Sequence, residues 1–249
     1  MIASLMMYLR PELAEAHARY WTLIHAGLAA RGIPAPERLR NEAEEFAVWN
    51  APDLTLSQTC GMPYRLLLHE RVTLVGTPDF GVQGCPPGYY NSVFVVRRND
   101  PRETIADFRR ARFAYNQSFS QSGYAAPYAH CAAQGFWFED RSQSHSHRTS
   151  AQAVAGGRAE IAALDAVSWR MIQRYDAFAA DLRVLTRTTP TPGLPYIAGA
   201  KADRSATFDA VSEAIAGLLP EDAEALGIRG LVAIPKAAYL AVPSPPKGA

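Results

Sequence analysis

The first part of the chain combines short apolar runs with one long amphipathic segment. Residues 2–8 form an apolar run that predicts a buried first strand. Pro11 suits the first turn of a helix, and from Leu13 to Leu28 apolar residues recur at helical spacing until Gly32. Shorter apolar runs at 46–49, 54–59 and 72–76 predict three further strands.

The rest of the chain alternates strands with helices. The patterns predict strands at 92–96, 112–115, 161–164 and 182–186, and helices at 104–111, 124–133, 149–155 and 167–175. Ser205 is the expected N-cap of a helix that runs to Leu219. Alternation of this kind predicts an α/β fold with mainly parallel sheets flanked by helices.

Charge and hydropathy narrow the classes of function. The 249 residues include 25 Lys and Arg against 24 Asp and Glu, so the near balance leaves no broad basic face for nucleic acid. No apolar stretch approaches the roughly 20 residues that span a bilayer, so we expect no membrane insertion. No basic residue precedes the first apolar run, which ends at Arg10, so we do not expect an export signal there. We expect a cytoplasmic protein from this sequence, or a periplasmic one if an upstream signal was removed.

Neither the cysteines nor any familiar enzyme motif identifies a catalytic site in this sequence. Cys60, Cys85 and Cys131 include no C-x-x-C pair, although a Cys60–Cys85 disulfide stays open. The sequence contains no nucleophile elbow, phosphate loop, zinc-protease motif or dinucleotide fingerprint. We therefore expect no cofactor. Cys60 is the best nucleophile candidate, with His147 as its partner, but a buried inert thiol is the commoner fate of such a residue.

Three loops that follow predicted strands concentrate hydroxyl and amide groups, at residues 57–64, 116–124 and 144–150. Ligands of open α/β sheets bind beyond the carboxyl ends of strands, and hydroxyls with backbone N–H groups at a helix start suit an anion. The same residue types also build ordinary turns, so Ser122 has an alternative interpretation as a simple N-cap.

Three other positions each allow two interpretations. His145 and His147 would share one face of a strand and could bind a metal, but no third ligand is evident nearby. Asp165 ends a predicted strand and either faces a crevice or caps the next helix through Ser168. Residues 193–196 predict a rigid turn with Tyr196 as a possible cleft wall.

The order of these loops resembles the phosphate-, phosphite- and phosphonate-binding proteins of ABC transporters (the PhnD-like family). The most specific segment is Ser120-Gln121-Ser122-Gly123-Tyr124, which is similar to the family's Ser-Thr-Ser-Gly anion loop, with Gln121 in place of the threonine. The second is His147 followed by residues 151–165, which match the family's binding histidine, helix, glycine turn and strand. The resemblance extends from Ala3 to about Tyr239.

The resemblance implies a set of ligand-binding residues. Ser120, Gln121, Ser122 and His147 would hold the anionic group, with His147 acting as an imidazolium. Asp165 would face the other end of the ligand. The opposite lobe would contribute Tyr8 and the turn that contains Gln58, Thr59 and Gly61.

The resemblance also implies a two-lobed type 2 periplasmic-binding-protein fold. Residues 1–92 and 186–249 would form lobe 1 and residues 93–185 lobe 2, with a two-strand hinge near 92–96 and 182–186. We expect a monomeric solute-binding protein that closes on a small anionic ligand and serves an ABC transporter permease. The alternatives are an enzyme on the same fold that uses His147 or Cys60, and a cytoplasmic ligand sensor with a protein partner.

Overall fold

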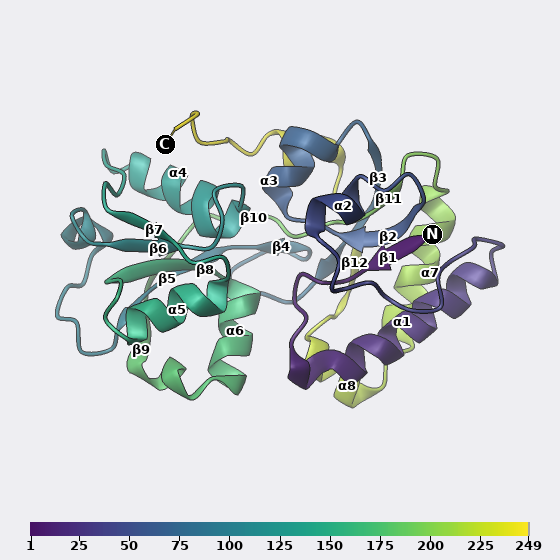
Figure 1. Cartoon of the computed structure of the whole chain (residues 1–249), viewed down its shortest axis with the longest axis horizontal. Coiled ribbons are helices and arrows are strands. Elements are labelled where there is room, and N and C mark those ends of the chain that lie inside the picture. The colour runs from purple at the N-terminus through teal and green to yellow at the C-terminus, as the bar shows by residue number, and fades with distance from the viewer. Residues whose placement is uncertain (249) are drawn as a thin grey trace. The chain divides into compact units, whose positions relative to one another are not determined.

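The computed structural model describes residues 1–248 and divides the chain into two compact units. Unit 1 contains Met1–Tyr89 and Pro192–Leu240, and unit 2 contains Tyr90–Thr191 together with residues 241–248. Each unit is built on a five-stranded sheet with helices packed against it (Figure 1). The α/β fold predicted from the alternating pattern is confirmed in both.

Unit 1 has the sheet order β1-β2-β11-β3-β12. Helix α1 packs against α7, where Gly27 allows close approach because a Cβ there would lie 3.2 Å from the Cβ of Ala210. The elements of this unit are β1 (Ile2–Ser4), η1 (Pro11–Leu13), α1 (Ala14–Ala29), α2 (Glu45–Trp49), β2 (Leu54–Gln58), α3 (Gly61–Pro63), η2 (Tyr64–Leu68), β3 (Val72–Asp79), β11 (Tyr196–Gly199), α7 (Arg204–Ala216), α8 (Pro220–Leu226), β12 (Gly230–Val232) and α9 (Lys236–Leu240).

Unit 2 has the sheet order β7-β6-β8-β5-β9. Its core is rich in aromatic residues, and the rings of Phe113 and Phe138 stack with centroids 4.6 Å apart. The elements of this unit are β5 (Ser92–Arg97), η3 (Ile105–Phe108), β6 (Phe113–Tyr115), η4 (Gln121–Ala125), α4 (Ala126–Ala132), β7 (Arg141–Gln143), α5 (His147–Ala155), β8 (Ile161–Asp165), α6 (Ala166–Tyr175), η5 (Ala177–Asp181) and β9 (Leu182–Arg187).

Strand direction corrects the expectation of mainly parallel sheets. Neighbours β1 and β2 are parallel, as are β6 with β7 and β6 with β8. Strand β11 is antiparallel to β2 and β3, β12 is antiparallel to β3, and β5 is antiparallel to β8 and β9. The sheets are therefore mixed. Two of the strands that run against their neighbours, β5 and β11, are the ones that the chain enters first after passing from one unit to the other, and β12 is a third.

Two short strands carry the chain between the units. Strand β4 (Tyr89–Tyr90) leads into unit 2 and β10 (Thr191–Pro192) leads back, and the two pair with each other. The strands at 92–96 and 182–186, expected at the hinge, are β5 and β9 in the sheet of unit 2. The division into lobes at 92/93 and 185/186 stays a prediction.

Several predicted elements are wrong in kind. Residues 46–49 form helix α2, because the Glu44 carboxylate caps it by accepting a 2.8 Å hydrogen bond from the Ala47 N–H. The helix expected at 104–111 is a single 3₁₀ turn, η3, closed by a capping box between Thr104 and Asp107. The N-cap of α7 is Asp203, two residues before the predicted Ser205.

The cysteines and the helices settle two further points. Cys60, Cys85 and Cys131 take part in no disulfide, so the Cys60–Cys85 bridge that the sequence left open does not form. Within residues 1–248, no helix combines the length and the apolar character that crossing a membrane requires.

Candidate functional site

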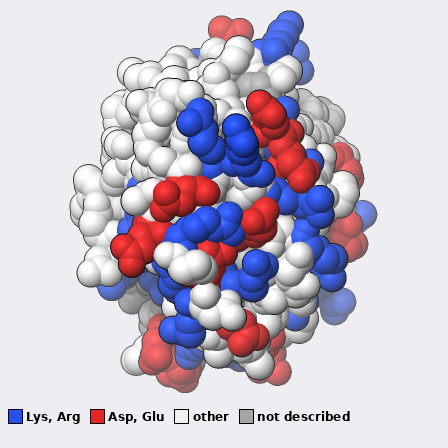
Figure 2. Space-filling view, turned by 90° about the vertical axis from the view of Figure 1, so that its left-hand side faces the viewer, with Lys and Arg blue, Asp and Glu red and all other residues white. Residues whose placement is uncertain are grey.

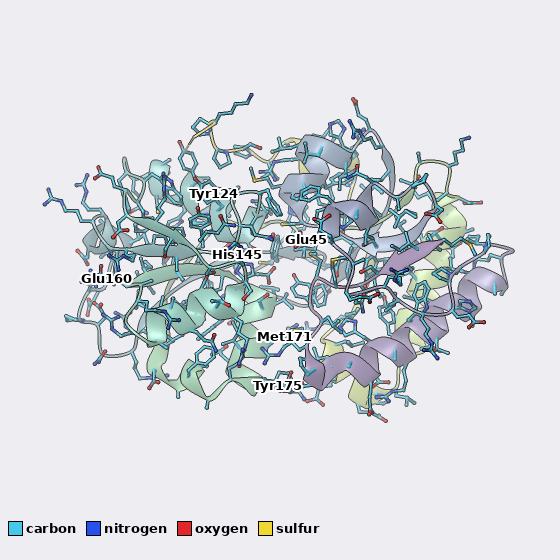
Figure 3. The ribbon with its side chains drawn as sticks, viewed as in Figure 1. Glu45, Tyr124, His145, Glu160, Met171 and Tyr175 are labelled. Atoms are coloured by element: carbon cyan, nitrogen blue, oxygen red, sulfur yellow. The ribbon has the colours of Figure 1, made fainter. Side chains whose placement is uncertain are left out.

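Three parallel strands of unit 2 end at one edge of its sheet. Loop 116–120 follows β6, loop 144–146 follows β7, and Asp165 is the last residue of β8. Tyr124 and His145 lie toward this edge, and Glu160, which precedes β8, lies at the opposite end of the sheet (Figure 3). The fold therefore gathers the predicted anion-binding residues at the carboxyl ends of parallel strands, where α/β sheets place their ligands.

The opposite end of unit 2 carries paired charges. Arg102 donates to Asp100 at 2.7 Å and to Glu160 at 3.0 Å, and Arg112 donates to Asp140 at 3.0 Å. Figure 2 shows basic and acidic side chains interspersed across this face. The guanidinium of Arg102 also lowers the pKa of Asp100 to about 2. At the end of the sheet away from the candidate site, these arginines and carboxylates thus form ion pairs with one another.

The loop after β6 begins a π-helical turn, η4. The Ser120 hydroxyl caps the turn by accepting a 3.0 Å hydrogen bond from the Gly123 N–H, and the Ala125 N–H donates to the Ser120 carbonyl at 3.0 Å. Ser120, Gln121 and Ser122 are only 2–3% exposed. Turns of this kind are frequent at functional sites. Three polar side chains are therefore buried together where the sequence predicts an anion loop.

Ser122 is hydrogen-bonded to His147, the first residue of α5. The Ser122 Oγ lies 3.0 Å from His147 Nε2, whereas Nδ1 is buried and makes no well-formed hydrogen bond within residues 1–248. Burial lowers the pKa of His147 to about 4, and the backbone of Ala163 offsets this shift only in part. The ring is therefore neutral near pH 7 when no anion lies beside it, and the imidazolium expected at the bound ligand stays a prediction.

The loop before α5 fixes the position of His147. The Ser144 N–H donates to the Tyr115 carbonyl at 2.8 Å, and the His145 N–H donates to the Asn116 carbonyl at 2.9 Å. His145 has a φ of 68°, a left-handed conformation that is uncommon outside glycine, and Ser146 caps α5 through the Thr149 N–H. His145 and His147 thus share no strand face, which removes the geometry assumed for a metal site.

Asn116 begins the candidate loop 116–124 but was not among the ligand-binding residues that the sequence predicted. Its Oδ1 is buried without a hydrogen-bond partner within residues 1–248, and it lies against Gly123 so closely that a Cβ at Gly123 would overlap it. The same Cβ would lie 3.3 Å from Cε1 of His147. Gly123 is therefore required for close packing, and Asn116 joins Ser122 and His147 in one cluster. The sequence feature that could have identified Asn116 is its position as the first polar residue after a buried strand.

Asp165 caps α6, as one of its two interpretations predicted. Its Oδ1 accepts hydrogen bonds from the N–H groups of Val167 at 2.7 Å and Ser168 at 3.1 Å. The residue is 2% exposed and lies opposite Ser92 in the β5–β8 register. Capping and a ligand contact are compatible because a carboxylate accepts several hydrogen bonds.

Buried polar residues on neighbouring strands surround Asp165, and the sequence reasoning did not select them. The Ser92 N–H donates to Thr188 Oγ1 at 2.9 Å, and the Ala166 N–H donates to the Asn91 carbonyl at 3.1 Å. Asn91, Ser92 and Thr188 are 1–5% exposed. The sequence feature that could have identified them is their polar character at the start of the buried strand β5 and just after β9.

Unit 1 places its predicted residues at the end of β2 or in the segments that follow β1 and β2, which are parallel. Tyr8 follows β1 and packs edge-on against Phe80 with ring centroids 4.9 Å apart. The Gln58 side chain donates to the Leu194 carbonyl at 3.1 Å, and the Thr59 N–H donates to the Pro195 carbonyl at 3.1 Å. Gly61 is buried at the start of α3. The segment 193–196, predicted as a rigid turn, therefore contacts the end of β2.

The Ser122–His147 geometry also resembles a nucleophile beside its base. A general base works best when its pKa lies near the operating pH, and a pKa of about 4 makes His147 a weak one. Within residues 1–248, no three His, Cys, Asp or Glu side chains form a group suited to a metal ion. The chemistry most natural to the cluster is hydrogen bonding to a bound group.

The fold and these loops define a class of protein, the periplasmic solute-binding proteins. A family model described as the periplasmic substrate-binding protein of phosphonate ABC transporters matches residues 55–239. The chain belongs to this family, and the resemblance seen in the sequence is confirmed. The match includes the loops after β2, β6 and β7. No curated protein matched the sequence.

Solved structures share the fold at low sequence identity. PhnD1 of Prochlorococcus marinus in complex with methylphosphonate is 15% identical, with a TM-score of 0.70 over 96% of this chain and 94% of that one. A binding-protein component of an ABC phosphonate transporter from Pseudomonas aeruginosa is 14% identical, with a TM-score of 0.69 over 96% and 82%. A Xanthomonas citri protein bound to ATP is 16% identical, with a TM-score of 0.69 over 95% and 91%.

Proposed function

We propose that this solute-binding protein binds a small phosphonate and delivers it to an ABC transporter permease in the periplasm. The observation that carries the proposal is the buried cluster of Ser120, Ser122 and His147 beyond the carboxyl ends of β6 and β7. The family description supports the ligand class and the compartment. We also propose that the protein works as a monomer.

The cluster is suited to an anion because it presents hydroxyl donors in a buried setting. Ser120 Oγ accepts from the Gly123 N–H, which leaves its own O–H to donate. When His147 carries its proton on Nε2, the ring donates to Ser122 Oγ and the Ser122 O–H is available for the ligand. Hydrogen bonds to a charged acceptor are about twice as strong as neutral ones, so a phosphonate oxygen gains most from this arrangement.

Gln121 and Asp165 would define the rest of the ligand. Gln121 stands where the resemblance gives threonine, so its amide replaces a hydroxyl as donor and adds bulk to the anion loop. We propose that Asp165 accepts from an amine or hydroxyl at the far end of the molecule. We also propose that Tyr8, Gln58, Thr59 and Gly61 of unit 1 contribute to ligand binding.

Isothermal titration calorimetry tests the ligand class. The panel is methylphosphonate, an aminoalkylphosphonate, phosphate, phosphite, small carboxylates and ATP, with sodium chloride as the inert control. We expect saturable binding of a phosphonate, and weaker binding to Ser122→Ala than to the matched variant Ser118→Ala, whose serine is exposed in the same loop. Binding of ATP or a carboxylate alone would replace the proposed ligand, and no binding at all would overturn the proposal.

The same samples separate binding from catalysis. We expect the phosphorus NMR spectrum of the bound ligand to stay that of one compound over a day of incubation with the protein. Conversion to a new phosphorus species that disappears in His147→Gln would establish the enzyme alternative. Conversion that disappears in Cys60→Ser would assign that chemistry to the thiol.

A further inference from the structure

His17 is a buried polar residue that none of the roles above explains. It lies in the first turns of α1, on the face that buries Leu13, Tyr20 and Ile24, and it is 7% exposed. Both of its ring nitrogens are buried, and neither makes a well-formed hydrogen bond within residues 1–248. Most buried polar side chains in folded proteins are paired, so an orphaned imidazole requires a reason.

Stability does not supply that reason. A buried donor or acceptor without a partner destabilises the folded state, and an apolar side chain of similar volume at the same place would not. Burial lowers the pKa of His17 to about 4, so the ring is neutral near pH 7 and carries one donor and one acceptor. Sites that break a packing rule in this way are often functional.

The surroundings of His17 connect it to both predicted ligand segments of unit 1. The backbone of Tyr8 lies close enough to the ring to oppose the effect of burial on its pKa, although it makes no well-formed bond. One helical turn further, the Tyr20 hydroxyl lies 3.3 Å from that of Tyr196, and Tyr196 is in register with Gln58. On the buried face of α1, His17 thus lies near the backbone of Tyr8. Tyr20 on the same face contacts Tyr196, which is paired with Gln58.

We propose that His17 is a positioning residue for ligand binding, which fixes the Tyr8 segment by donating a hydrogen bond to the Tyr8 carbonyl when the ligand is bound. The inference rests on the proposed function. Catalytic hydrogen bonds are often long without ligand and tighten in the complex, and we infer the same behaviour for this binding segment. Binding of the ligand against Tyr8 would bring the Tyr8 carbonyl within hydrogen-bonding distance of the His17 ring N–H.

The experiment compares three variants in calorimetry with the phosphonate that the wild-type protein binds. His17→Leu removes the donor at similar volume and is expected to weaken binding about tenfold, the effect of roughly one hydrogen bond, without lowering the melting temperature. His17→Gln keeps an N–H donor and is expected to restore most of the affinity. His25→Leu, on the same helix, is the matched control and is expected to bind like the wild type.

The outcomes separate this inference from the proposed function. Unchanged affinity in His17→Leu, or equal losses in His17→Leu and His17→Gln, would overturn the positioning role while the phosphonate site stands. A wild-type protein that binds nothing in the panel would overturn the proposed function and this inference with it. Should His17→Leu fail to fold, the ¹⁵N spectrum of the wild-type imidazole decides. A ligand-induced shift of the His17 ring nitrogens supports the new hydrogen bond, and an unchanged spectrum contradicts it.

Discussion

The Oγ of Ser122 and the Nε2 of His147 lie 3.0 Å apart, so one hydrogen bond joins the turn after β6 to the helix after β7. Ser122 is held by a π-helical turn and His147 by a capped helix start, and both turns emerge from parallel strands. Each side chain therefore restricts the other before any ligand arrives. Pre-organisation of this kind reduces the entropy lost on binding.

The Ser122 hydroxyl is expected to bind the ligand directly. Ser122→Ala should weaken phosphonate binding by about 1–2 kcal/mol, or roughly five- to thirtyfold, because one hydrogen bond to a charged oxygen is lost. Calorimetry measures the loss. Ser118→Ala should leave affinity unchanged, since Ser118 is exposed. Equal affinities for the two variants would remove Ser122 from the site.

Gly123 and Asn116 are expected to be coupled. In Gly123→Ala the new methyl group overlaps Asn116 Oδ1, so both stability and ligand affinity should fall, with a destabilisation of about 1–3 kcal/mol for overpacking. Adding Asn116→Ala should recover part of the stability by making room. A double-mutant cycle by urea unfolding measures the coupling free energy. Additive effects would show that the two residues do not compete for this space.

Asp165 allows its two roles to be separated by one pair of variants. Asp165→Asn keeps an N-cap for α6 but removes the charge, so stability should change little while binding of an aminoalkylphosphonate weakens. Asp165→Ala should lose about 1 kcal/mol of stability as well, since the Val167 and Ser168 N–H groups lose their acceptor. Thermal melts and calorimetry on both variants give the two readouts. An Asp165→Asn variant that binds the aminoalkylphosphonate with full affinity would restrict Asp165 to capping.

The buried histidines are expected to make the fold sensitive to acid. The pKa of His17 is about 4 in the folded protein against an ordinary value near 6.5, so between these values the unfolded chain binds the proton more tightly. The free energy of unfolding should therefore fall as the pH drops from about 6.5 to about 4, by up to about 3 kcal/mol from His17. His147 acts in the same direction, since burial also lowers its pKa.

Urea unfolding at about pH 5 and about pH 7, on either side of the ordinary histidine pKa, measures this fall in the free energy of unfolding. His17→Leu should reduce the difference in unfolding free energy between the two pH values. An unchanged difference in His17→Leu would show that His17 is protonated in both states or in neither.

The sequence sufficed for most of the fold because strands and loops here follow simple rules. Buried runs such as β5 and β8 are strands, and their flanking loops hold the polar residues. Strand direction was not predictable, because the alternation of apolar and polar residues along a strand is the same whether its neighbour is parallel or antiparallel. For α2, the apolar run 46–49 matches a strand pattern, and the Glu44 cap decides in favour of a helix. The rings of Phe46 and Trp49 then pack edge-on with their centroids 5.1 Å apart, because residues three apart on a helix lie on the same face.

The candidate site was predictable in its location and less so in its electrostatics. The hydroxyl loops identify Ser120, Ser122 and His147, but the charge of His147 depends on burial, which the local sequence does not reveal. Asn116 and His17 were not predictable as unpartnered groups, because a missing hydrogen bond is a property of the packed structure. Local sequence shows which groups are available, and tertiary packing decides which of them are left without a partner.

The hydrogen bond from the Ala125 N–H to the Ser120 carbonyl spans five residues, so this turn contains one residue more than an α-helical turn would. Deleting any one residue of the turn would let α4 continue backward as an ordinary helix. The remaining side chains would then rotate by about 100° about the helix axis. The direction in which loop 116–120 points relative to α4 thus depends on one residue of the turn, and the loss of one codon is the smallest heritable change that would redirect it.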